Sequence, residues 1–159
     1  MTFIFMNLIK VLSFMVLMCA CEKEATEKEA KESIKITIPT GYKGLFKLQE
    51  APSGSIPTRT NDCLVYIIPT SGVLTITSLK PFLKWHSLSV IDMDSTVLEV
   101  EPESAKSNQI AFYNLTVTSS GIKWCFIGTH EQAKRYQKFS SSELEVEKAK
   151  QDIEANRVK

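Results

Sequence analysis

Two carboxylates separated by one residue stand in the middle of the sequence. Asp92 and Asp94 belong to the stretch D-M-D-S-T, which follows the apolar run L-S-V-I and precedes V-L-E-V. Carboxylates in this arrangement suit nucleophilic attack by the first and acid or base chemistry by the second, with a bound Mg²⁺. The alternative is a polar turn between two strands, because Asp and Ser side chains hydrogen-bond to nearby backbone amides.

The D-M-D-S-T stretch resembles the active-site motif of the haloacid-dehalogenase superfamily, and within it the phosphoserine phosphatases. This resemblance implies a metal-dependent phosphatase with Asp92 as nucleophile and Asp94 as acid or base. That superfamily also carries a downstream Lys and a G-D-x-x-x-D-like segment, on a sheet that alternates with helices. This chain has no G-D pair, and Asp152 is its one aspartate after Asp94. We therefore expect a hairpin turn, with the hydrolase, or a Ca²⁺ site that adds Glu99, as alternatives.

The histidines and serines form no recognisable catalytic set. His86 and His130 lack the spacing of zinc ligands and are expected to be surface residues. Cys125 with either His has no local signature of a thiol nucleophile, and no Ser stands in a G-x-S-x-G setting. The sequence therefore predicts no catalytic residue, no metal ligand and no cofactor, and a protein that is not an enzyme.

The first twenty residues are predicted to be a lipoprotein signal peptide. Lys10 precedes an apolar run over 11–18, which is too short for a bilayer core of roughly 30 Å but suits a signal peptide. The run ends in M-C-A-C, which resembles a lipoprotein cleavage site with Cys21 as the lipidated residue. Cys19 is the rival acceptor, but Met18 would then stand before the cut, where a small residue is typical.

The lipid anchor would place the protein in a bacterial cell envelope, bound to the membrane. Glu22 after the lipidated Cys gives no inner-membrane retention signal, so we expect the outer membrane in a Gram-negative host. Met6 gives a cleaner signal start, M-N-L-I-K, than Met1 does. The chain has 19 basic and 18 acidic residues without a basic stripe, which argues against a nucleic-acid partner.

Four segments follow from these patterns: a signal peptide over 1–20, a charged tether over 21–32, a β domain over 33–139 and a peripheral helix over 140–159. Cys63 and Cys125 are the cysteines left in the exported domain. In an oxidising compartment they could form a disulfide or remain two buried thiols, and the sequence leaves both open.

Alternation of apolar and polar residues predicts strands in S-I-K-I-T-I-P, D-C-L-V-Y-I-I, V-L-T-I-T-S-L, I-A-F-Y-N-L-T-V-T and I-K-W-C-F-I-G. About eight short strands with frequent turn signals indicate a mainly β fold, an antiparallel sandwich or a barrel-like domain. Capping boxes at Thr129 with Gln132 and at Ser140 with Glu143 predict one or two C-terminal helices.

Four segments carry a second resemblance: I-P-T-G-Y-K-G at 38–44, E-A-P at 50–52, V-Y-I-I-P-T-S-G-V-L at 65–74 and F-I-G-T-H-E-Q at 126–132. They resemble an uncharacterised family of bacterial secreted and lipoprotein domains, over residues 34–138. The resemblance implies a β domain in the envelope and no assigned activity. Aromatic residues fall mostly in predicted strands and are expected to build the core, although an exposed pair would suit a carbohydrate or peptide groove.

The sequence supports three hypotheses for the function. The first is a lipid-anchored envelope protein with a non-catalytic β domain that binds an envelope protein or glycan, or has a structural role. The second is the metal-dependent hydrolase of Asp92 and Asp94. The third is an inhibitor or immunity-type lipoprotein.

Overall fold

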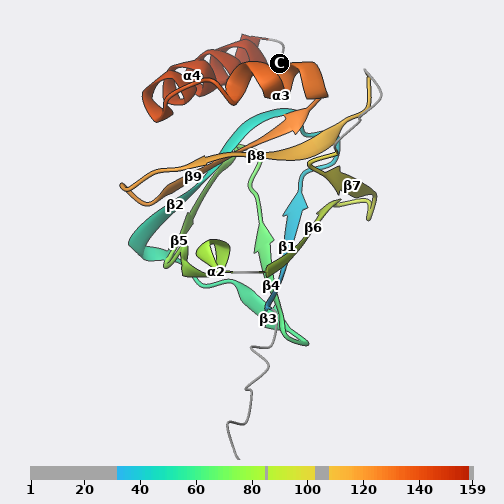
Figure 1. Ribbon diagram of the computed structural model, residues 1–159, viewed down its shortest axis with the longest axis vertical. Coiled ribbons are helices and arrows are strands. Elements are labelled where there is room, and N and C mark those ends of the chain that lie inside the picture. The colour runs from blue at the N-terminus through green and yellow to red at the C-terminus, as the bar shows by residue number, and fades with distance from the viewer. Residues whose placement is uncertain (1–31, 85, 103–107, 158–159) are drawn as a thin grey trace, which may run out of the picture. The chain divides into compact units, whose positions relative to one another are not determined.

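The computed structural model describes residues 32–84, 86–102 and 108–157 (Figure 1). Residues 31–159 form one compact unit. The predicted signal peptide, Cys21 and the tether up to residue 31 lie outside the described residues.

Within the described residues, nine strands form one sheet that curls into a half-barrel, in the order β3-β4-β1-β6-β7-β8-β9-β2-β5. The strands are β1 (Glu32–Ile38), β2 (Gly44–Ser55), β3 (Thr58–Thr60), β4 (Cys63–Ile67), β5 (Val73–Ile76), β6 (His86–Asp92), β7 (Val97–Val100), β8 (Ala111–Val117) and β9 (Ile122–Gly128). The helices are α2 (Lys80–Leu83), α3 (His130–Tyr136) and α4 (Ser141–Arg157). The predicted mainly β, barrel-like fold with C-terminal helices is confirmed.

The sheet is mixed, which corrects the expectation of antiparallel strands throughout. The pairs β1–β4, β1–β6, β2–β5 and β7–β8 run parallel, whereas β2–β9, β3–β4, β6–β7 and β8–β9 run antiparallel. Side chains alternate between the two faces in both kinds of pair, so alternation in the sequence does not reveal strand direction.

One core fills the inner face of the curled sheet. Ile34, Ile36 and Ile38 of β1 are at most 2% exposed, as the alternation predicts. Strand β9 is instead buried on both faces. Its Cys125 belongs to the inner core, whereas its Trp124 packs into a second core on the outer face.

Helices α3 and α4 cover this outer face (Figure 1). Both predicted capping boxes are present at their starts: Gln132 N–H donates to Thr129 Oγ1, and Ser140 N–H donates to the Glu143 carboxylate. The second core contains Leu45, Ala111, Tyr113, Trp124, Phe126, Ala133, Tyr136 and Leu144.

Polar bonds hold α4 on the sheet in addition to this core. Lys148, only 5% exposed, donates from Nζ to the Ser71 carbonyl at 2.8 Å, and Gln151 Oε1 accepts the Leu45 N–H at 3.0 Å. Gly72, in the P-T-S-G turn, has φ +67°, and a Cβ there would lie 2.1 Å from Tyr42 Oη. This turn therefore requires a glycine at position 72, because Tyr42 of the I-P-T-G-Y-K-G segment packs directly against it.

Candidate functional site

The D-M-D-S-T stretch is a hairpin turn between β6 and β7. The strands pair antiparallel, with Ile91 opposite Val97. Asp92 N–H donates to the Thr96 carbonyl at 3.0 Å, and Thr96 N–H donates to Asp92 Oδ1 at 2.8 Å. Ser95 completes the turn with φ +67°. The expected turn is confirmed.

This hairpin differs from the setting that the phosphatase resemblance implies. The stretch is followed by another strand and not by a helix, and Asp94 is exposed to solvent. Asp152 lies on α4, where it pairs with Lys148. Within residues 32–84, 86–102 and 108–157, no three His, Cys, Asp or Glu side chains gather as a metal site, so Asp92, Asp94 and Glu99 do not meet as Ca²⁺ ligands would.

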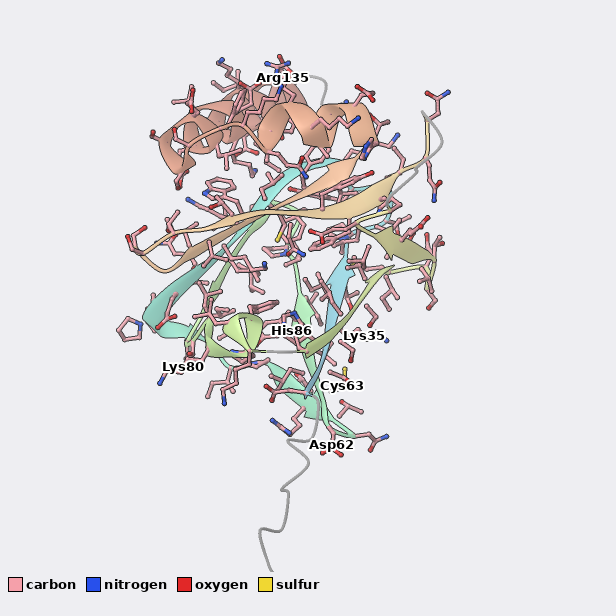
Figure 2. The ribbon with its side chains drawn as sticks, in the orientation of Figure 1. Lys35, Asp62, Cys63, Lys80, His86 and Arg135 are labelled. Atoms are coloured by element: carbon pink, nitrogen blue, oxygen red, sulfur yellow. The ribbon has the colours of Figure 1, made fainter. Side chains whose placement is uncertain are left out.

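Cys63 and Cys125 are free thiols and not a disulfide. Cys63 is half-buried at the start of β4 (Figure 2), whereas Cys125 is buried in β9, and β1, β6, β7 and β8 separate these strands in the sheet. Burial raises the pKa of the Cys125 thiol to about 11. The inertness of a buried, protonated thiol fits a core residue and not a nucleophile.

The two histidines are half-buried, so each remains partly exposed at the surface. His86 opens β6, with its ring 6.0 Å from that of Phe82 on α2. His130 begins α3, with its ring 5.9 Å from that of Tyr113. The aromatic neighbour of His86 is four residues away in the sequence, whereas that of His130 comes from strand β8.

A cleft of about 780 Å³ beside α2 is large enough to accommodate a ligand. The end of β2, the start of α2 and the turn between β8 and β9 form its walls. Leu83 and Val117 are 65% and 41% exposed, so apolar surface faces solvent here. The lining residues are Glu50, Ala51, Pro52, Thr77, Leu79, Leu83, Val117, Thr118, Ser119, Ser120 and Gly121.

The cleft exists because neighbouring strands end at different places. Strand β2 continues to Ser55, but its pairing with β9 ends near Glu50, whose N–H donates to the Gly121 carbonyl at 2.7 Å. The Glu50 carboxylate accepts the Leu79 N–H at 2.9 Å and so holds the start of α2. These bonds connect β2 to the turn between β8 and β9 and to the start of α2, and all three elements line the cleft.

Sequence reasoning missed both elements beside this cleft. The strands predicted from the sequence did not include residues 51–62, yet β2 extends through Ser55 and β3 follows. Sequence reasoning also predicted no helix at 80–83, although Pro81 in the first turn is typical of a helix start. That proline was the one available signal.

A buried lysine lies on β9, next to a strand that contributes to the cleft. Lys123 of β9 is 6% exposed and pairs across the sheet with Val117, which lines the cleft. Its Nζ lies 5.7 Å from the centre of the Phe82 ring. The Tyr66 ring packs 4.9 Å from Phe82, and its Oη is buried without a hydrogen-bond partner in the described structure.

A second, smaller groove of about 410 Å³ runs over the outer surface of α3 and α4. It is lined by Arg135, Phe139, Ser142, Glu143, Val146, Glu147 and Lys150. Arg135 and Glu147 pair across it at 3.8 Å, and Lys150 contacts the same carboxylate. Arg135 and Lys150 thus both pair with the Glu147 carboxylate inside the groove.

The helices of the described residues include none with the length and apolar character needed to cross a membrane.

Comparison with known proteins gives little likeness. No protein-family model matches the sequence, and no curated protein matches it. Among solved structures, the chain is similar to the crystal structure of "Putative Lipoprotein from Bacillus anthracis" with a TM-score of 0.43 and 11% identity. That similarity covers 78% of this chain and 96% of the other.

Proposed function

We propose that this protein is a lipid-anchored protein of the bacterial cell envelope, and that its β domain binds a ligand in the cleft beside α2 without catalysis. The M-C-A-C sequence supports the anchor, with Cys21 as the lipidated residue. The cleft carries the proposal of binding, because its volume of about 780 Å³ lies within the range of small-ligand sites.

The exposed apolar side chains of the cleft support the same function. Leu83 is 65% exposed at its mouth, although it belongs to a short helix whose Phe82 is buried. Apolar surface beside hydroxyl groups and a carboxylate is the mixture that orients a ligand within a site. Covering Leu83 and Val117 would remove their surface from water, at roughly 25 cal/mol per Å².

Site-specific photo-crosslinking in intact cells tests this function. A photoreactive phenylalanine analogue replaces Leu83 in the anchored protein, and Ile153 on α4, which is 55% exposed, serves as the control position. We expect a discrete adduct, identified by mass spectrometry, from position 83 and none from position 153. The absence of an adduct at position 83, or equal labelling at both positions, would contradict binding in the cleft.

A further inference from the structure

The outer face of strands β4, β1, β6 and β7 carries an apolar row that is open to solvent. In the strand register, Thr37 of β1 lies between Ile67 of β4 and Ile91 of β6. Ile91 in turn pairs with Val97 of β7. Ile67 and Val97 are 57% and 73% exposed, and the other two residues are half-buried. Single apolar residues are ordinary on a protein surface, but a row across four strands indicates an interaction surface.

The strand directions in this region also favour a covered face. Strand β1 runs parallel to both of its neighbours, β4 and β6. Parallel strands are usually covered on both faces of the sheet. The inner core covers one face of these strands, through residues such as Ile36, Tyr66 and Val90, whereas α3 and α4 pack onto β2, β8 and β9 (Figure 1). The outer face of β4, β1 and β6 is therefore the side that a partner would cover.

Opposite charges lie in the next row of the same face. Lys35 of β1 stands two residues before Thr37 and pairs with Ser89 of β6. Glu99 of β7 stands two residues after Val97, and because β7 runs antiparallel to β6 it falls in this same row. Lys35 and Glu99 therefore lie on opposite sides of β6, one strand away from it in each direction.

This arrangement is complementary to itself under one two-fold axis. An axis that runs along β6, between two facing copies, places β1 of each copy over β7 of the other. Lys35 of each copy then meets Glu99 of the other. In the apolar row, Thr37 meets Val97 and the two Ile91 side chains meet each other. The same surface thus supplies both the apolar contact and the pairing of opposite charges.

A two-fold axis across the strands fits less well. Centred on this face, it would place the apolar row over Ser33 and Ser87, whose hydroxyl groups hydrogen-bond to each other at 2.9 Å. It would also bring the two chains into β1 from opposite ends, since β1 begins at Glu32. With the axis along β6, both chains enter β1 from the same end, which allows two anchors at Cys21 to enter one membrane.

We propose that a second copy of this chain covers this face, so that the outer faces of β4, β1, β6 and β7 pack against each other in a two-fold symmetric dimer. The face is small, because four strands about 4.8 Å apart and five residues of about 3.3 Å each span roughly 19 by 16 Å. Stable interfaces bury about 800 Å² per partner, so the association is weak. Holding two copies on one membrane strengthens it.

Sedimentation equilibrium of residues 31–159, a unit that is compact by itself, measures association without the anchor. We expect a dimer with a Kd between about 10 µM and 1 mM. Val97→Ser should weaken it about 10-fold, because each dimer loses two apolar contacts. Val146→Ser changes an exposed valine of α4 and should leave the Kd unchanged. A monomer at every concentration up to about 1 mM, or equal weakening by both variants, would overturn the inference.

Charge reversal tests the geometry of the dimer. Lys35→Glu and Glu99→Lys should each weaken self-association about 10-fold, because each dimer then contains two like-charge pairs. A mixture of the two variants should form a mixed dimer at least as tight as the wild-type dimer, since opposite charges then meet at both places. Failure of the mixture to associate, with both variants folded by circular dichroism, would overturn the inference.

Crosslinking in intact cells tests the full chain. Cysteine replaces Ser89, which lies on the proposed axis, in a Cys63→Ser background, and a short bismaleimide is added. We expect a crosslinked dimer of the chain, identified by mass spectrometry. Ser142→Cys, at an exposed position of α4, is the control and should give none. The absence of a crosslinked dimer from position 89, or equal yields from both positions, would contradict the dimer.

A membrane surface is the alternative occupant of this face. Flotation of residues 31–159 with vesicles of phosphatidylethanolamine and phosphatidylglycerol tests it. We expect no binding, because Glu99 and the exposed Asp94 of the adjacent turn repel an anionic surface. Flotation that Val97→Ser abolishes would identify the membrane as the partner and overturn the inference. The proposed ligand binding rests on the cleft beside α2 and does not depend on this face.

Discussion

The carboxylate of Asp92 accepts the backbone N–H of Thr96 at 2.8 Å across the turn that joins β6 to β7. The first acid of the D-M-D-S-T stretch therefore closes a hairpin, and the second, Asp94, projects into solvent. A pair of carboxylates that resembles a nucleophile motif thus has a local structural explanation.

Amide replacements in this turn should change stability little. Asp92→Asn keeps an oxygen that accepts the Thr96 N–H, and Asp94→Asn alters an exposed residue, so each should change the free energy of unfolding by no more than about 0.5 kcal/mol. Asp92→Ala removes the acceptor and should cost about 1 kcal/mol, whereas Asp94→Ala should stay near zero. Urea unfolding of residues 31–159 measures all four. Large, equal losses in both Asn variants would indicate a buried or metal-holding loop.

Phosphatase activity provides a separate test of the same turn. We expect no hydrolysis of an aryl phosphate above the buffer blank with Mg²⁺, because Asp92 is engaged by the backbone of its own turn. Wild type and Asp92→Asn should behave alike. Magnesium-dependent turnover that disappears in Asp92→Asn would restore the hydrolase hypothesis.

Two glycines should separate backbone strain from steric clash. Gly41 and Gly72 have φ +71° and +67°, but a Cβ at Gly41 meets nothing within 4 Å, whereas one at Gly72 meets Tyr42 Oη at 2.1 Å. Gly41→Ala should cost about 1–2 kcal/mol from the left-handed conformation alone. Gly72→Ala should cost more, and adding Tyr42→Phe should recover part of that excess. Equal costs for the two single variants in denaturant unfolding would contradict the clash.

Alkaline pH should destabilise the fold through Cys125. Its pKa rises from 9.0 to about 11 on folding because the thiol is fully buried, so the unfolded chain loses this proton first. The stability from the buried thiol is therefore complete below pH 9 and falls progressively as the pH rises toward 11. Melting temperatures across this interval should fall less steeply in Cys125→Ala than in wild type. Identical pH slopes would argue that Cys125 does not titrate with unfolding.

Membrane anchoring should depend on Cys21. Replacing Cys21 with Ala should release the protein from the membrane fraction or leave it unprocessed, because we propose this residue as the site of lipid attachment. Cys19→Ala is the matched control and should still be cleaved and lipidated, as shown by metabolic labelling with a fatty acid. A lipidated, cleaved Cys21→Ala protein would identify Cys19 as the acceptor.

Local features of this fold follow from the sequence alone. The alternation of Ile34, Ile36 and Ile38 predicts a half-buried strand. The Asp-rich stretch at 92–95 predicts the turn that joins β6 to β7. Both capping boxes also form where they are expected. Each of these features depends on residues a few positions apart, so the information lies within one short segment.

The tertiary structure decided what no short segment contains. Apolar and polar residues alternate in the same way in parallel and in antiparallel strands. The mixture of parallel and antiparallel pairs in this sheet therefore depends on which distant strands pair with each other. Cys63 and Cys125 stay apart because β4 and β9 are distant in that order. Lys123 occupies a strand position that the sequence marks as polar, yet it is buried, with its Nζ 5.7 Å from the centre of the Phe82 ring of α2. The cleft arises where β2, α2 and the turn between β8 and β9 meet, which is a property of the assembled sheet.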